Sequence, residues 1–393
     1  MTSITKSIIR CLTVILICQS AGAQTPLMDQ LTALNEKFVQ AYGQKNWTES
    51  LRHLEQMAAL ADRLGDQRIR AGVLYNTACV LSLAGQKTRA IAAIREAVAS
   101  GYTDYAKIAG DSDFDPLRGE AEFRALLSDL KARYGPRPLA WDRGQSPPPF
   151  PVTYDDPQAP EFEELRREFA LDNVVAGAKD DYERLRRLTA WVSSRWQHSP
   201  DQTASKTDPF TILREAQTGG RFICRDYAVV LAGVAGAFGM PARLLNLLPK
   251  DVETRSEAHS VAEVWLEQFH KWVLADGQYG SIGELDGEPL SGLELQAAFA
   301  EDKPVRCAVG AATCDEWKPF ILRNSYYFKI GDDQRSFRRR VQKQLVLVPL
   351  GAPDPHKFAG GSEEVFAGAV YTSNPATFYS PPPGRKRALR HAP

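Results

Sequence analysis

The sequence has no excess of either charge and, after its first 23 residues, no long hydrophobic run. Its 48 basic residues balance its 48 acidic residues, so bulk charge gives no reason to expect nucleic acid as a partner. The basic run Arg338-Arg339-Arg340 lies between turn-like residues and a predicted strand, and we interpret it as a solvated edge. Glycine-rich phosphate loops, metal-binding helix motifs and nucleotide fingerprints are also absent from the sequence. We therefore expect no nucleic-acid partner and no cofactor.

The remaining composition is that of an ordinary globular protein. Of the 393 residues, 44% are apolar, 24% charged and 9% aromatic. At roughly 100 to 200 residues per domain, this length favours two or three compact units. Collagen-like, coiled-coil and wholly disordered chains are excluded, and function must be sought in a local site.

The N-terminus has the features of a secretory signal. Two basic residues precede an apolar run at residues 11–18, and Ala21-Gly22-Ala23 follows. This order is typical of a cleavable signal peptide, and the run is too short to span a bilayer comfortably. We predict that residues 1–23 are removed and that the chain is exported, to the periplasm or out of the cell. No integral membrane segment is then expected in the mature chain.

Four of the six cysteines follow the predicted signal, and export would allow disulfides among them to persist. Cys307 and Cys314 enclose a short segment rich in glycine and alanine, where we predict a small disulfide loop. No CxxC pair or nearby histidine supports zinc, so we expect no metal. Cys79 lies in an alanine-rich helical stretch and is interpreted as a small buried apolar residue. Cys224 has different surroundings.

Residues 28–134 have a helical hydrophobic period, with glycines between long amphipathic segments. The triplet Gly-Gln-Lys at residues 43–45 recurs at residues 85–87, so the period is 85 minus 43, or 42 residues. The segment resembles tetratricopeptide repeats, although that family's period is about 34 residues. The resemblance implies either a groove for a peptide partner or a brace for the next domain, and both readings stay open.

Eight prolines in residues 136–160 separate this helical region from the rest of the chain. Such a density prevents helix and disfavours a central strand, so residues 135–160 are predicted to be a semi-rigid linker or wrapping arm. A mixed pattern of helices and strands then predicts an α+β domain over residues 161–350. Residues 351–393 are interpreted as a C-terminal extension whose tail, from Ser380, is disordered.

The predicted α+β domain begins with helices and continues with strands. Helices are expected over residues 182–197, from the Asp208-Pro209 cap to Gly219-Gly220, and over residues 224–238. Strands are expected at residues 242–248, 259–266, 272–276, 326–330 and 344–350. A short polar turn joins the second and third of these strands, which predicts a hairpin.

Cys224 has the setting of a nucleophilic cysteine. It starts a predicted helix directly after the Gly219-Gly220 turn, so its sulfur would lie at the positive end of the helix dipole. His259 opens one strand of the predicted hairpin and Asp276 closes the other, so the turn brings the carboxylate close to the imidazole. A thiol, an imidazole and an orienting acid are the groups that nucleophilic cysteine catalysis needs.

Two sequence blocks resemble the transglutaminase-like domain of the papain-like superfamily, over roughly residues 181–283: GGRFICRDYAVVLAGVAGAFGMPARLL and AHSVAEVWLEQFHKWVLADGQYG. The resemblance implies an α+β papain-like fold and a Cys-His-Asp triad at Cys224, His259 and Asp276. The family commonly has glycine two residues before the cysteine, where this chain has Phe222. That departure puts the substrate channel in question more than the triad.

Other residues compete for some of these roles. Glu263, on the same strand face as the predicted catalytic histidine, is an alternative acid. His270 competes as the histidine, but it falls in the hairpin turn, where exposure is expected. The backbone amide of Cys224 is the first expected oxyanion donor. Trp196, which resembles an indole of some transglutaminases, and Gln217, the papain-like counterpart, are candidates for the second donor.

The resemblance implies an exported cysteine enzyme that acts on protein or peptide amide bonds through a thioester intermediate. We expect hydrolysis rather than amine transfer, because water is always present and transamidation needs a shielded amine channel. The alternative is a non-catalytic scaffold or peptide-binding protein that uses its helical repeats.

Overall fold

The structure is a computed structural model that describes residues 26–144, 147–308, 314–359 and 363–384. The chain forms two compact units, Met1–Gly135 and Pro136–Pro393. The predicted signal peptide lies outside the described residues. No helix in the described part of the chain is long and apolar enough to cross a membrane.

The described part of the first unit is all helical. Its helices are α2 (Pro26–Gly43), α3 (Trp47–Leu64), α4 (Gln67–Leu83), α5 (Lys87–Ala99), α6 (Tyr105–Gly110), the 3-10 helix η2 (Ser112–Leu117) and α7 (Ala121–Tyr134). Helix α2 packs on α3, and α4 packs on α5. The turns within both pairs fall at the repeated triplet, where Lys45 has a φ of 56° and Gly85 a φ of 75°. The helical region is confirmed, whereas its likeness to tetratricopeptide repeats and its peptide partner stay predictions.

The second unit contains a six-stranded sheet with the order β3-β2-β1-β7-β8-β9. All neighbouring strands are antiparallel except β8 and β9, which are parallel. The strands are β1 (Ala242–Leu248), β2 (His259–Leu266), β3 (Lys271–Ala275), β7 (Tyr327–Gly331), β8 (Gln344–Leu347) and β9 (Ala369–Thr372). A smaller sheet has the order β5-β4-β6, with β4 (Ile282–Leu285), β5 (Glu288–Pro289) and β6 (Arg306–Ala308).

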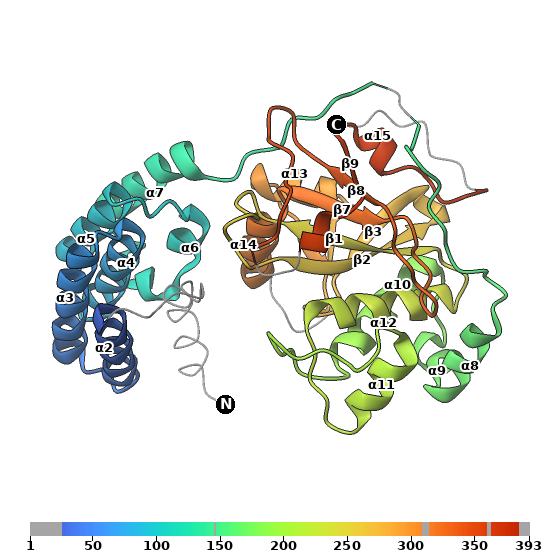
Figure 1. The fold of residues 1–393 in the computed structure, drawn as a ribbon, viewed down its shortest axis with the longest axis horizontal. Helices are drawn as coiled ribbons and strands as arrows, with labels where there is room; N and C mark the ends of the chain where they lie inside the picture. Colours follow the sequence, from blue (N-terminus) through green and yellow to red (C-terminus); the bar gives the residue numbers. More distant parts are fainter. Residues whose placement is uncertain (1–25, 145–146, 309–313, 360–362, 385–393) are drawn as a thin grey trace. The chain divides into compact units, whose positions relative to one another are not determined.

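Helices cover both faces of the large sheet (Figure 1). The helices of this unit are α8 (Pro160–Glu168), α9 (Leu171–Val175), α10 (Asp181–Ser193), α11 (Pro209–Gln217), α12 (Cys224–Gly236), α13 (Gly292–Ala300), α14 (Cys314–Asn324) and α15 (Pro375–Phe378). Strand β2 alternates between two cores, because successive side chains point to opposite faces. Ala262 and Val264 pack in the core that holds α10 and α12, whereas Val261 and Trp265 pack in the core that holds α13 and α14. The mixed architecture is consistent with a transglutaminase-like fold.

Helix α12 begins at Cys224, as predicted, after a turn held by backbone pairing. The Asp208 side chain accepts a hydrogen bond from the Thr211 N–H at 2.9 Å and caps α11, which confirms the predicted helix start. After α11, the Ile223 N–H donates to the Gln202 carbonyl at 2.9 Å. The chain enters α12 from this extended segment, so the side chain at position 224 lies at the helix N-terminus.

The sheet domain extends past residue 350, where we expected a separate C-terminal extension to begin. Strand β9 pairs with β8, and the Phe378 carbonyl accepts a hydrogen bond from Arg243 Nη1 at 2.9 Å. Ser380, the expected start of a disordered tail, accepts from Trp272 Nε1 at 2.9 Å through its carbonyl. The side chains of Phe378 and Tyr379 from this segment pack in the core that holds α13 and α14. Residues 385–393 lie outside the described residues.

The proline-rich segment packs along the same domain. Leu350 N–H donates to the Ala140 carbonyl at 2.9 Å, and Thr153 N–H donates to the Asp332 carbonyl at 2.8 Å. Phe150 is 7% exposed and packs in the same core as residues of α13 and α14. A segment without helix can still bury single apolar side chains, and here it forms a wrapping arm.

Candidate active site

Cys224 lies at the N-terminus of α12 and is partly buried. Burial raises the pKa of its thiol, but hydrogen bonding and charge attraction to His259 outweigh burial, and a backbone hydrogen bond from Ser260 adds to their effect. The net pKa lies below the ordinary value of a thiol. A lowered pKa increases the fraction of thiolate, which is the nucleophilic form.

His259 opens strand β2 and is fully buried. Its Nε2 lies 2.8 Å from Asp276 Oδ2. Burial lowers the pKa of His259, but the charge of Asp276 and the hydrogen bond to it outweigh burial and raise the pKa to about 10. The other ring nitrogen, Nδ1, has no hydrogen-bond partner of standard geometry among the described residues. Because Nε2 contacts Asp276, Nδ1 is the nitrogen that interacts with the Cys224 thiol. Hydrogen bonds between catalytic groups are often long until substrate binds.

Asp276 follows strand β3 and is also fully buried. Its Oδ2 accepts from Trp317 Nε1 at 2.8 Å as well as contacting His259. Its Oδ1 accepts from the backbone N–H groups of Gln278 at 3.0 Å and Tyr279 at 3.1 Å. Burial raises the pKa of Asp276, but the charge of His259 and these hydrogen bonds lower it below its ordinary value. The carboxylate therefore stays ionised and fixed in orientation.

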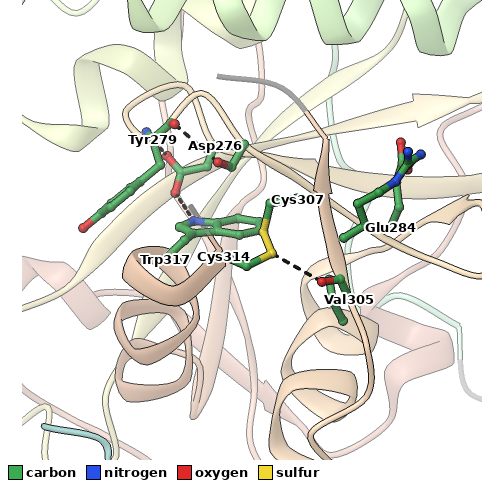
Figure 2. Close-up of a disulfide and its surroundings, with 9 residues drawn as sticks. Asp276, Tyr279, Glu284, Val305, Cys307, Cys314 and Trp317 are labelled. Atoms are coloured by element: carbon green, nitrogen blue, oxygen red, sulfur yellow. Dashed lines mark hydrogen bonds and ion pairs between the residues drawn. A yellow bond between two sulfur atoms is a disulfide. The ribbon is translucent and has the colours of Figure 1, made fainter. Parts of the chain in front are cut away.

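Trp317 is the site residue that sequence reasoning missed. It is fully buried on α14, and Figure 2 shows its indole nitrogen turned toward the Asp276 carboxylate. One turn later on the same helix, Phe320 packs on the His259 ring with 4.8 Å between ring centroids. Trp317 and Asp276 are 41 residues apart, and no spacing rule in the sequence links them. The feature of the sequence that could have pointed to Trp317 is its position three residues after Cys314 of the predicted disulfide.

Cys307 and Cys314 are joined by a disulfide in the structure (Figure 2). Cys314 begins α14, three residues before Trp317. Cys307 lies on β6, which pairs with β4. The disulfide thus ties the start of the helix that carries Trp317 to the smaller sheet.

The two oxyanion candidates differ in their surroundings. Trp196 is 7% exposed, and its Nε1 is buried without a hydrogen-bond partner in the described structure. Its ring packs on Tyr227, one turn after Cys224, with 4.2 Å between ring centroids. Gln217 is exposed at the end of α11, and no contact in the described ranges joins it to the other candidate site residues. Trp196 thus has a buried N–H without a partner and packs on the first turn of α12, whereas Gln217 has no such contact in the described ranges.

The competing acid and histidine lie elsewhere. Glu263 is fully buried, and its Oε2 accepts from Arg243 Nη2 at 2.7 Å and Nε at 3.0 Å. It therefore neutralises an arginine rather than orienting the imidazole. The His270 side chain is 48% exposed in the hairpin turn, where its φ of 49° is left-handed.

A group of potential metal ligands lies in the helical unit. The ligand atoms of Cys79, Asp111 and Asp113 lie within 4.8 Å of one another, and all three residues are buried. The Tyr42 hydroxyl donates to Asp113 Oδ2 at 2.6 Å, and the Tyr75 hydroxyl donates to Asp111 Oδ2. These phenol hydrogen bonds already satisfy the carboxylates, so the arrangement fits a buried polar network without an ion.

Comparisons with known proteins identify a family for part of the second unit. A search of curated proteins finds no match. Among solved structures, the chain is similar to "a Putative Cysteine Protease" from Cytophaga hutchinsonii, with a TM-score of 0.26 and 19% identity. The similarity covers 33% of this chain and 40% of that chain. Residues 169–277, which contain Cys224, His259 and Asp276, match the Transglutaminase-like superfamily and form a transglutaminase-like domain.

Proposed function

We propose that this protein is an exported cysteine enzyme that hydrolyses amide bonds of proteins or peptides through a thioester on Cys224. The observation that carries the proposal is the buried line of groups from Trp317 through Asp276 to His259, with the thiol of Cys224 beside it. Export is supported by the disulfide on α14, because disulfides persist mainly in oxidising compartments.

The proposed first step forms a bond between the Cys224 sulfur and the substrate carbonyl carbon. The carbonyl electron pair moves to oxygen, and the backbone N–H of Cys224 and the indole N–H of Trp196 stabilise that oxyanion. When the carbonyl re-forms, the C–N bond breaks, and the amine leaves with the proton of the His259 imidazolium. The acyl group remains on sulfur as a thioester.

The second proposed step uses water. Neutral His259 removes a proton from a water molecule, whose oxygen attacks the thioester carbonyl. The C–S bond breaks, a carboxylic acid leaves, and the thiolate-imidazolium pair is restored. An amine that attacks the same thioester would give transamidation. Hydrolysis is the preferred outcome because water is always available.

The proposal is tested by the reactivity of Cys224 toward iodoacetamide, which needs no known substrate. Because the pKa of Cys224 is lowered, its thiolate should persist as the pH falls below the ordinary pKa of a thiol. At pH 6 we expect alkylation about tenfold or more faster than in the same protein unfolded in urea. Mass spectrometry of peptides locates the label. An equal rate in the folded and unfolded protein would contradict a catalytic Cys224 and favour a scaffold.

A matched control is available because Cys79 is the other cysteine outside a disulfide in the described part of the chain, and it is buried. A Cys79→Ala variant should leave the fast alkylation unchanged, whereas a Cys224→Ala variant should remove it. Incubation with peptides and a labelled primary amine then separates the two outcomes of the thioester. Stable incorporation of the amine would overturn the preference for hydrolysis.

Trp317 is expected to act as a positioning residue for Asp276. A Trp317→Phe variant keeps an aromatic ring in the buried site but removes the donor to Asp276 Oδ2. We expect the alkylation rate of Cys224 at pH 6 to fall about tenfold, the usual scale for losing a hydrogen bond to a charged group. The double variant with Asp276→Asn shows whether the effect passes through Asp276. In the Asp276→Asn protein, Trp317→Phe should change the alkylation rate of Cys224 little. A further tenfold fall in that rate would indicate that Trp317 has a merely structural role.

A further inference from the structure

A cationic pocket lies between the loop before α11 and the segment that follows β7. Its volume is about 830 Å³. Five of its lining side chains are basic: Lys206, Arg335, Arg338, Arg339 and Arg340. Asp208, the cap of α11, is the acidic residue that lines it. We interpreted the arginine run as a solvated edge from sequence, but Arg339 is only partly exposed between its exposed neighbours.

Only part of this positive charge is neutralised within the domain. Asp333 binds Arg335 through two hydrogen bonds, at 3.0 Å to Nε and 2.7 Å to Nη2. Glu161 accepts from Arg338 Nη2 at 2.9 Å. In the described part of the chain, no carboxylate forms an ion pair with the other three cations, which are Lys206, Arg339 and Arg340. The pocket therefore has cations that remain available to an anion.

The guanidinium of Arg339 shows which anion would fit. Its Nε and Nη2 atoms are buried and have no hydrogen-bond partner among the described residues. These two atoms form the edge of a guanidinium that binds a planar carboxylate through two parallel hydrogen bonds. The chain uses this edge elsewhere: Arg214 donates from Nε at 2.8 Å and Nη2 at 2.7 Å to the two oxygens of Glu168.

Burial without a partner has an electrostatic cost at Arg339. Burial lowers the pKa of Arg339 to about 10, although attraction to Asp333 and Asp155 opposes the change. A carboxylate on the free edge would offset this cost, because charge-assisted hydrogen bonds are strong where water is excluded. Asp155 does not fill that role, because Arg339 Nε and Nη2 have no partner among the described residues and Asp155 Oδ2 instead accepts from the Ser336 N–H at 2.7 Å.

Arg339, which lines the pocket, lies near the first turn of α12. The residue after Cys224 is Arg225, whose charge also contributes to lowering the pKa of Arg339. Farther along the helix, Ser336 lies near Gly233, so the segment that carries Arg339 also meets α12 at a second place. The loop before α11 is held to the same turn, because the Ala204 N–H donates to Asp226 Oδ2 at 3.4 Å.

We propose that this pocket binds carboxylate side chains of an acidic peptide substrate and so directs acidic sequences to Cys224. The inference rests on the proposed function for its role in catalysis, but its binding chemistry stands on the pocket alone. Carboxylate is the anion proposed because the Nε and Nη2 edge of Arg339 is the edge with which Arg214 and Arg335 bind carboxylates in this chain.

The test measures binding by the full chain with Cys224→Ser, so that no turnover is needed. The probes are two fluorescein-labelled octapeptides, four Gly-Glu repeats and four Gly-Gln repeats, compared by fluorescence anisotropy at low salt. We expect the glutamate peptide to bind about tenfold more tightly or better, because glutamine has the same shape but no charge. Equal binding of the two peptides would overturn the proposal.

Variants connect that preference to the pocket. Arg339→Met should remove most of the preference for glutamate. The double variant Lys206→Gln with Arg340→Gln should reduce it too, and both of its substitutions are at exposed positions that should not disturb folding. Arg214→Met is the matched control, because it removes one charge from α11 but lies outside the pocket. A preference that survives in both pocket variants would overturn the assignment.

A third measurement adds inorganic phosphate, at the concentration of the peptide, as a competitor of the labelled glutamate peptide. If phosphate alone competes as well as the glutamate peptide, the pocket takes free anions and the acidic-peptide proposal fails. The two proposals fail separately, because alkylation of Cys224 is measured without peptide and peptide binding is measured without the thiol. Slow alkylation with intact peptide binding would reject the cysteine enzyme and leave the acidic-peptide site in place.

Discussion

An Asp276→Asn variant is expected to lose about three to four orders of magnitude in turnover, the scale found when the acid of a catalytic triad becomes an amide. In the folded protein, the charge of Asp276 overcomes burial and raises the pKa of His259 to about 10. The imidazole therefore stays protonated at neutral pH, and its charge lowers the pKa of Cys224. Asparagine has a similar shape but supplies no charge.

The sign of the pH effect follows from the same balance. Without the carboxylate, burial dominates and the pKa of His259 falls, so the ring is neutral at pH 7. The thiolate then loses its cationic partner and the pKa of Cys224 rises. We expect the pH profile of iodoacetamide alkylation to move to higher pH, with the largest loss of rate below the ordinary pKa of a thiol.

The control for this result is Asp251→Asn, which changes an acidic side chain that is 48% exposed and pairs with Arg255. This variant should leave the alkylation profile where it is in the unchanged protein. An Asp276→Asn variant with an unshifted profile would show that the carboxylate does not act on Cys224 through His259. The proposed proton transfer would then be wrong.

A Glu263→Gln variant is expected to lower the free energy of unfolding of the second unit by about 3 to 5 kcal/mol, the usual effect of leaving one partner of a buried ion pair uncompensated. Arg243 is 1% exposed and Glu263 is fully buried. The guanidinium also packs over the Trp272 ring, with 4.4 Å to the ring centroid, and over the Tyr379 ring, with 4.9 Å. Glutamine at position 263 would leave the positive charge of Arg243 in a low dielectric without a counter-ion.

Urea unfolding followed by tryptophan fluorescence measures this effect, because six of the seven tryptophans lie in the second unit. The matched control is Arg214→Met, which breaks the exposed pair with Glu168 and should cost less than about 1 kcal/mol. The double variant Arg243→Met with Glu263→Met should cost less than the sum of its single substitutions, since no charge is then left buried. A loss below about 1 kcal/mol for Glu263→Gln would contradict this account.

The two buried acids of the β2–β3 hairpin thus have different expected roles. Glu263 neutralises Arg243, which ties β1 to the C-terminal segment at Phe378. Asp276 instead contacts an imidazole that also interacts with a thiol. From sequence, both were candidate partners of His259, because both lie near it on the predicted hairpin. Their partners come from other elements, which the local pattern does not reveal.

The local sequence was enough to predict the parts of the site that neighbouring residues decide. The helix start at Cys224, the cap at Asp208 and the β2–β3 hairpin are confirmed, because capping, turn chemistry and hydrophobic period act over a few residues. The hairpin brings the imidazole and the carboxylate together, whereas the packing of α12 on β2 brings the helix start that carries the thiol to the hairpin.

Tertiary packing decided what the local pattern could not. The indole of Trp317 reaches Asp276 across 41 residues, and strand β9 joins the sheet from a segment that we interpreted as an extension. The cationic pocket likewise combines residues 206–208 with residues 335–341. Such contacts depend on how whole helices and strands bury their apolar faces against one another. The spacing of residues within one segment does not predict which elements pack together.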